Sequence, residues 1–353
     1  SSGTTFTSGP ENLTVTDNFT LPGISDDKPT AGTTRFNENL GALEFYTGVE
    51  WKAVNSYVDM GNRGRGYFAG GRTPTPGSIA DTKKIDTVQI SSLGNAVNFG
   101  ELTNTRRNHG NCSSSIRGLC ISGSYNGSPS NSIDYFTLSS EGNAIDFGDA
   151  TASDQGESAL ASSTRGVHAT GNPSNKTMDY VQIATLGNAL DFGDRVISLD
   201  EHGAIGSATR GLFCGGGAPS GSAPNSIMQL ITIASTGDAS HFGDLSYTAR
   251  ETAGCSNATR GLVAGGYSPN VNTIEYITMA TLGNSSDFGD MSFARSHFAS
   301  CSSQLRSLFA SALGNQASID SVEILTTGNA VDFGDLTNGG HNADGTSNAH
   351  GGL

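Results

Sequence analysis

Short runs of alternating apolar and polar residues recur along this chain, and they predict strands rather than helices. Residues 274–279 read Ile-Glu-Tyr-Ile-Thr-Met, which is the two-residue period of a strand. Gly-Asn and Gly-Gly steps separate such runs and supply turns, because glycine adopts positive φ without steric cost. We therefore expect a chain of many short strands joined by tight turns.

A phrase close to Asn-Ala-x-Asp-Phe-Gly-Asp occurs six times. Its central Phe returns at intervals of 45 to 50 residues, and a period of that size indicates an array of small supersecondary units. A motif that occurs six times is more typical of a structural scaffold than of an active site. We therefore predict that these Phe side chains pack between units. The residues are Phe99, Phe147, Phe192, Phe242, Phe288 and Phe333.

One repeat can be divided into four strands. In residues 250–291, strand a covers 251–257, strand b 261–264, strand c 274–279, and strand d contains Asp287 and Phe288. Four strands in about 45 residues is typical of a β-propeller blade. The predicted fold class is therefore an all-β propeller of four-stranded blades. Strand b with its flanks reads RGYFAGG (65–71), RGLCISG (117–123), RGVHATG (165–171), RGLFCGG (210–216), RGLVAGG (260–266) and RSLFASA (306–312).

The two ends of the repeat region are expected to close the ring. Trp51 lies one period before Phe99, and residues 347–353 align with 256–262. We predict seven blades, the seventh built from about 36–53 plus 337–353, because joining the first and last strands removes exposed edges. The alternative is six blades and a separate N-terminal hairpin. Residues 1–35 lie outside the period and are predicted to be a docking arm or tether to the propeller at 36–353.

Composition narrows the classes of partner. The chain has 33 acidic and 19 basic side chains, for a net charge of −14. This balance argues against nucleic-acid binding, which needs a Lys- and Arg-rich surface. The sequence has no run of about 18 apolar residues, so no membrane insertion is expected.

Other repeated positions also favour scaffold roles. An Arg begins each strand b and an acidic residue follows each Phe-Gly, which suggests Arg–carboxylate pairs between blades. The five cysteines occupy apolar core positions and are predicted to be free thiols that pack as small hydrophobes. The acids are Glu101, Asp149, Asp194, Asp244, Asp290 and Asp335; the Arg residues are Arg65, Arg117, Arg165, Arg210, Arg260 and Arg306; the cysteines are Cys112, Cys120, Cys214, Cys255 and Cys301.

Candidate chemistry is sparse. His109, His202 and His297 fall near the start of strand a, close to the central channel of a propeller. A metal or catalytic cluster there is one interpretation of these three residues. The interpretation that we adopt assigns no catalytic residue, no metal ligand and no cofactor, because no known catalytic arrangement stands out from the repeat background.

The loops between strands b and c differ in every repeat, whereas the turns between strands c and d hardly change. Variable loops on a constant frame are where binding usually takes place. The b–c loops are predicted to share one face with the d–a loops. The binding residues predicted on that face are Tyr125, Asn126, Tyr267 and Asn270, since Tyr presents an apolar body with a polar tip.

Two resemblances extend these expectations. Three features of the repeat resemble kelch repeats: the diglycine after strand b (Gly265-Gly266), the strand-c Tyr (Tyr276) and an aromatic residue in strand d. The strand-d aromatic departs from the kelch pattern, because it is Trp only at Trp51 and Phe in the other six copies. Residues 32–54 resemble a segment of phage tail fibres. The repeated TIATxGNAxDFGDLT phrase resembles structural proteins of marine phages, especially cyanophages.

The phage resemblance implies a non-enzymatic virion protein, such as a tail fibre or appendage. It would be located on the particle surface in multiple copies and held by its N-terminal arm to other virion proteins. Its implied external partner is a host receptor or glycan. A purely architectural capsid decoration protein is one alternative. A propeller enzyme, such as a glycan hydrolase or oxidase, is the other.

Overall fold

The computed structural model describes residues 30–37, 42–49, 51–53, 64–75, 78–171, 175–218 and 224–353. Its regular structure over these residues is β throughout, and none of them forms a helix able to cross a membrane. The chain divides into two units, residues 1–61 and 62–353. Most of the predicted N-terminal arm, residues 1–29, lies outside the described residues.

The first unit contains a small antiparallel sheet of β1 (Thr34–Asn37), β2 (Ala42–Tyr46) and β3 (Trp51–Ala53). The ring of Trp51 lies 5.4 Å from that of Tyr46 and 4.0 Å from the Arg35 guanidinium carbon. Arg35 Nε also bonds Glu44 Oε2 at 2.8 Å. Trp51 therefore stabilises a sheet of its own and is not a strand-d aromatic of a blade.

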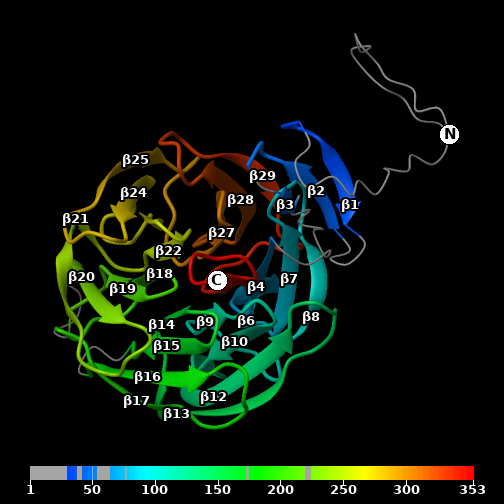
Figure 1. The fold of residues 1–353 in the computed structure, drawn as a ribbon. Helices are drawn as coiled ribbons and strands as arrows, with labels where there is room; N and C mark the ends of the chain where they lie inside the picture. The colour runs from blue at the N-terminus through cyan, green and yellow to red at the C-terminus, as the bar shows by residue number, and fades with distance from the viewer. Residues whose placement is uncertain are drawn as a thin grey trace. The chain divides into compact units, whose positions relative to one another are not determined.

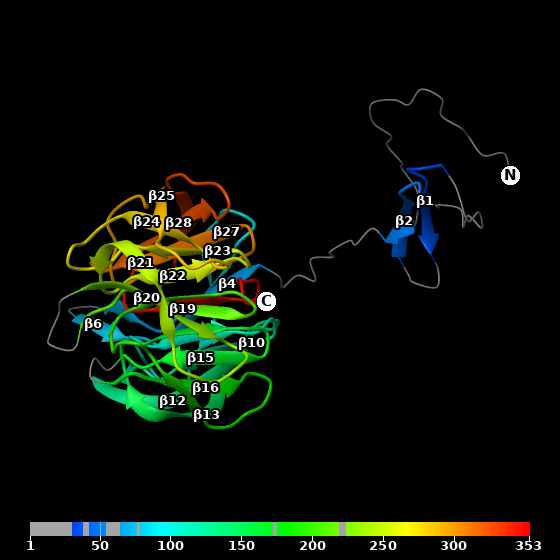
Figure 2. The same ribbon diagram turned by 60° about the vertical axis from the view of Figure 1, so that its left-hand side comes forward.

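Residues 64–353 form a propeller of six four-stranded blades around a central axis (Figure 1). Figure 2 shows the same blades after a 60° turn about the vertical axis. Blade 1 contains β30 (Asp344–Ser347), β4 (Arg65–Ala69), β7 (Lys84–Gln89) and β8 (Val97–Glu101). Blade 2 contains β9 (Gly110–Ser113), β10 (Arg117–Ile121), β12 (Ser128–Thr137) and β13 (Ile145–Asp154).

The other four blades follow the same order. Blade 3 contains β14 (Ser158–Ala161), β15 (Arg165–Ala169), β16 (Thr177–Gln182) and β17 (Leu190–Asp194). Blade 4 contains β18 (Gly203–Gly206), β19 (Arg210–Cys214), β20 (Asn225–Thr232) and β21 (Ser240–Ala249). Blade 5 contains β22 (Ala253–Ser256), β23 (Arg260–Ala264), β24 (Thr273–Thr278) and β25 (Ser286–Asp290). Blade 6 contains β26 (Ala299–Ser302), β27 (Arg306–Ala312), β28 (Gln316–Glu323) and β29 (Val331–Asp335).

The prediction of seven blades is wrong, and the six-blade alternative is confirmed. The ring does close through strands from both ends of the propeller, since β30 pairs with β4 in the register Ser347↔Gly66. These strands, however, complete the blade of Phe99. That blade has no strand a of its own before β4, and Thr346 of β30 lies opposite Tyr67 as Cys112 lies opposite Leu119 in blade 2.

The repeated phrase joins each blade to the next. Between blades 2 and 3, Gly187 N donates to Phe147 O at 3.0 Å and Ala189 N donates to Asp149 O at 2.7 Å. The Asn188 side chain accepts from Asp149 N at 3.0 Å. Between blades 6 and 1, Gly94 N donates to Phe333 O at 2.9 Å. The phrase therefore forms a continuous rim around the closed ring.

The predicted core positions are confirmed. The six repeated Phe side chains are 2–3% exposed, and all five cysteines are buried free thiols. Cys112 of strand a in blade 2 touches Gly166 of strand b in blade 3. A Cβ at Gly166 would lie 2.8 Å from Cys112 Sγ. Small residues on strand b thus make room for the neighbouring blade.

The recurrent Arg joins blades, but its partner differs from the prediction. Arg165 Nη1 donates to Ile233 O at 3.0 Å in the next blade, and its guanidinium carbon lies 4.4 Å from the Tyr180 ring in its own blade. The repeated acids form no ion pair with these Arg residues within the described parts of the chain; Glu101, for example, pairs with Lys83 at 2.7 Å. The same contact to a carbonyl of the next blade is made by Arg117 to Ile183 (3.0 Å), Arg210 to Met279 (3.0 Å), Arg260 to Ile324 (3.0 Å) and Arg306 to Ile90 (3.1 Å).

Candidate functional site

The described parts of the b–c and d–a loops lie on one face of the propeller, as predicted. Strands a and b are antiparallel, with Gly203 opposite Cys214, so strand a begins at the edge where strand b ends. We call this edge of the six blades the loop face. A cavity of about 100 Å³ opens there at the axis, between the first residues of the six strands a.

Six residues surround this cavity, one from each blade and each two positions before strand a. Apart from Gly156, with φ 80°, they are non-glycine residues with φ between 50° and 59°, a left-handed conformation that is uncommon for such side chains. Backbone bonds join five of the six neighbouring pairs: for example, Glu201 N donates to Gly156 O at 2.8 Å and Glu251 N to Glu201 O at 2.6 Å. We call this set the collar. It comprises Asn108, Gly156, Glu201, Glu251, His297 and Asn342.

Three collar side chains from blades 4, 5 and 6 converge. One ligand atom from each of Glu201, Glu251 and His297 lies within 4.8 Å of the others. Burial and the neighbouring carboxylates, Glu251 first among them, raise the pKa of Glu201 to about 8. The positive charge of Arg250, whose Nε lies 3.8 Å from Glu201 Oε2, lowers the pKa of Glu201 but only partly offsets this rise. The arrangement can hold a proton or a cation between two carboxylates.

Tyr267 joins the predicted binding face to this cluster. Its ring lies 6.1 Å from that of His297 and 5.2 Å from the Arg250 guanidinium carbon. Tyr267 is 39% exposed, and Asn270 of the same loop is also exposed. This part of the loop face therefore combines an exposed aromatic ring with charged groups.

Tyr125 and Asn126 lie on the opposite side of the ring, in blade 2. Tyr125 is 42% exposed and belongs to β11 (Ser124–Tyr125), which forms a hairpin with β12. Asn126 has φ 49° and begins the turn of that hairpin with Gly127. The structure thus places all four predicted binding residues on the loop face but does not bring the two pairs together.

The other two histidines near strand a do not join the cluster. His109 and His202 are buried between blades. Burial and Arg106 lower the pKa of His109 to about 3. Burial, Arg195 and His168 lower the pKa of His202 well below its usual value. Both rings are neutral packing groups at neutral pH.

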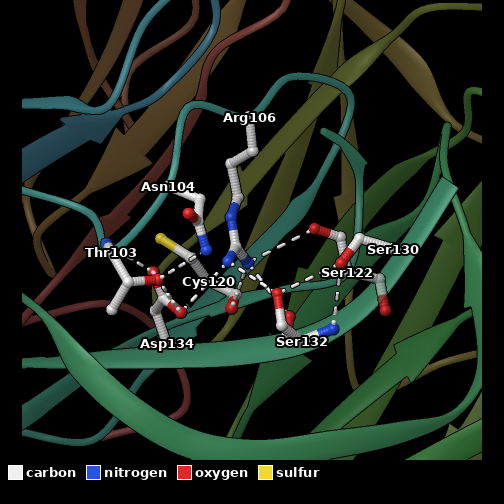
Figure 3. Close-up of polar contacts among 8 residues, drawn as sticks. All are labelled: Thr103, Asn104, Arg106, Cys120, Ser122, Ser130, Ser132 and Asp134. Atoms are coloured by element: carbon white, nitrogen blue, oxygen red, sulfur yellow. Dashed lines mark hydrogen bonds and ion pairs between the residues drawn. The ribbon is translucent and has the colours of Figure 1, made fainter. Parts of the chain in front are cut away.

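A second polar ring, which sequence reasoning missed, lies inside the blades. In each strand c one buried polar residue accepts hydrogen bonds from the end of strand d of the previous blade or from the segment that follows it. Figure 3 shows the position in blade 2: Thr103 N donates to Asp134 Oδ2 at 2.9 Å, and Arg106 Nη2 lies 3.0 Å from Asp134 Oδ1. Arg106 also donates to the carbonyls of Cys120 and Ser132. The ring comprises Asp86, Asp134, Asp179, Gln229, Glu275 and Asp320.

The channel is filled at the face opposite the cavity. Residues 348–353 follow β30 and lie at the axis of the ring (Figure 1, red). Gly351 N donates to Ser256 O at 2.9 Å, and His350 Nε2 lies 2.8 Å from Ser113 O. A Cβ at Gly352 would lie 1.9 Å from Ala161 O, so this segment touches blades 2, 3 and 5. The axis therefore opens toward the loop face.

Comparison with known proteins adds no assignment: no protein-family model matches the chain, and no curated protein is significantly similar to it. The candidate site rests on geometry. A sequence signal for Glu201 and Glu251 did exist, because they occupy the same repeat position as His297.

Proposed function

We propose that this chain is a non-enzymatic structural protein of a phage virion, a tail fibre or appendage, whose loop face binds a host receptor or glycan. One observation supports a binding role above the others: the described parts of the loops that fail to repeat lie on the same face as the axial cavity and the exposed Tyr125 and Tyr267. The virion role rests on the resemblance of residues 32–54 and of the repeated phrase to phage structural proteins.

The rigidity of the frame favours presentation rather than movement. Each blade is joined to the next by the repeated phrase and by the buried polar ring, and five of the six blades also make an Arg–carbonyl contact to the next blade. A rigid frame reduces the entropy that is lost on binding. Many copies on a particle would turn weak contacts into useful avidity.

A direct test is binding of the fluorescently labelled chain to cyanobacterial cells and to a glycan array. We expect saturable binding that Tyr267→Ala or Tyr125→Ala lowers at least tenfold. The matched control is Leu186→Ala, which removes an exposed side chain (57% exposed) from the c–d turn on the opposite face. The binding proposal fails if wild-type protein binds neither, or if Leu186→Ala lowers binding as much as the Tyr variants.

The architectural alternative predicts a different result. A decoration protein without a receptor would bind capsid or tail particles and show no saturable binding to cells. Electron microscopy of the particle with this chain located would distinguish a fibre, a tail component and a capsid ornament.

A further inference from the structure

The three converging groups of the collar have a composition typical of a metal site. Glu201 and Glu251 supply carboxylate oxygens and His297 supplies a ring nitrogen, with all three atoms within 4.8 Å of one another. They come from three consecutive blades, and each stands two residues before strand a. The packing of consecutive blades around the axis, and not sequence proximity, brings them together.

The incomplete hydrogen bonding of these oxygens provides a second indication. Glu251 is 9% exposed, and its Oε2 forms an ion pair with His297 Nδ1 but accepts no regular hydrogen bond. Glu201 Oε2 likewise accepts no hydrogen bond and has only the Arg250 Nε at 3.8 Å as its charged neighbour. Buried carboxylate oxygens are costly unless a donor or a cation compensates them.

The adjoining cavity gives space for further coordination. Its volume of about 100 Å³ exceeds what one water molecule needs. Asn111 is 4% exposed, lines this cavity and has an unpartnered Oδ1. Additional ligands of a bound ion, water or an amide oxygen, therefore have a place beside the cluster.

The ligand types indicate the class of ion. Mixed carboxylate and imidazole ligands suit Zn²⁺ and Mn²⁺, whereas Ca²⁺ and Mg²⁺ prefer all-oxygen sites. We propose that Glu201, Glu251 and His297 bind one divalent transition-metal ion, Zn²⁺ or Mn²⁺, at the axial opening of the loop face. With three protein ligands, such an ion keeps open positions toward the cavity.

The experiment is calorimetric titration of the full chain, stripped with chelator, with Zn²⁺ and separately with Mn²⁺. We expect one ion per chain for at least one of the two metals. Glu251→Gln and His297→Gln should each weaken that binding at least tenfold, because each removes a direct ligand. Glu323→Gln removes the same charge from an exposed carboxylate that pairs with Arg306, and it should bind the metal like wild type.

A second readout covers the case in which a variant folds poorly. Metal should raise the thermal midpoint of wild-type protein and of Glu323→Gln, because it binds the folded state. It should not raise the midpoint of Glu201→Gln. The proposal is overturned if neither metal binds stoichiometrically, or if ligand variants bind as wild type does. Since no receptor enters this experiment, its failure is independent of the proposed host-binding role.

Discussion

Gly148 and Gly187 have the same backbone conformation but different surroundings. Their φ angles are 146° and 148°, but a Cβ at Gly148 would lie 2.6 Å from the backbone of Gly187, whereas a Cβ at Gly187 meets nothing within 4 Å. The glycine at position 148 is therefore required both by its conformation and by the close approach of the next blade.

We predict that Gly148→Ala is more destabilising than Gly187→Ala by about 1–3 kcal/mol, the usual cost of overpacking. Both variants pay the same conformational cost, so the difference isolates the clash between blades. Urea unfolding of the two variants measures it. Equal free energies of unfolding would show that this approach of two blades does not limit stability.

Asp344 offers a test of pH dependence at a single residue. Its carboxyl lies in the wall of the axial cavity, and burial raises its pKa from 3.8 to about 7 although Asn111 N and Gly345 N donate to it. The folded state thus binds this proton more tightly than the unfolded state. The free energy of unfolding should fall as pH rises from about 4 to about 7, and the loss is complete above that range.

Replacement of Asp344 by Asn removes this titration. We expect the slope of stability against pH to decrease in that window by up to about 1.4 kcal/mol per pH unit. Urea unfolding at pH 5 and pH 8 is the measurement, with Asp332→Asn at an exposed acid as control. A slope in Asp344→Asn that equals that of wild type would contradict the assignment.

At the scale of elements, strand c carries the buried polar ring, whose members differ in charge balance. Asp134 faces the fully buried Arg106, whereas Asp179 faces His168, whose pKa burial lowers to about 4. His168 is therefore neutral at pH 7 and needs no counter-charge. Gln229 at the same position of blade 4 shows that an amide can occupy this ring.

We predict that Asp134→Asn costs about 3–5 kcal/mol, because it leaves the Arg106 guanidinium buried without its counter-charge. Asp179→Asn should change stability by less than about 1 kcal/mol. Thr151 donates only to Asp179 Oδ2, and Oδ1 has no hydrogen-bond partner, so an amide can keep the bond. Equal losses in the two variants would show that hydrogen bonding, not charge, dominates the ring.

The elements themselves were predictable from the sequence, because strand period and turn residues are local signals. The diglycine after strand b shows why its variants are tolerated: Ser122-Gly123 has φ 53° and 91°, close to the 62° and 91° of Gly70-Gly71. The partner of the recurrent Arg was not predictable. Every residue has a backbone carbonyl, so the sequence contains no signal that marks the one that Arg165 contacts. The repeated acids do stand out in the sequence, and they therefore suggested the wrong partner.

At the scale of the molecule, the number of blades depended on which segment supplies strand a of blade 1. Trp51 lies on the repeat period, but β30 supplies the strand a that β4 lacks. Periodicity cannot distinguish an extra half-blade from a separate sheet, because pairing between distant strands is a property of the closed ring. The same limit applies to Glu201, Glu251 and His297, which are brought together only by the packing of three consecutive blades around the axis.

Closure by β30 therefore leads to a prediction for the whole propeller. Thr346 Oγ1 and Ser347 O bond the Ser113 hydroxyl at 2.7 and 2.6 Å, and Asn348 Oδ1 accepts from Gly64 N and Arg65 N at 2.8 and 3.0 Å. Removal of residues 344–353 deletes these bonds and the inner strand of blade 1. We expect the thermal midpoint to fall by about 10 °C or more, since each lost kcal/mol lowers it by about 2–4 °C.

The matched control removes residues 1–61, the other compact unit. Because Trp51 and its sheet contribute no strand to the six blades, this chain should keep the wild-type midpoint within about 2 °C. Hydrogen exchange should then separate the two cases: the amides of β4 lose protection without 344–353 and keep it without 1–61. If removal of 1–61 instead exposed β4, the first unit would be part of the closure, and a propeller of six self-sufficient blades would be the wrong description.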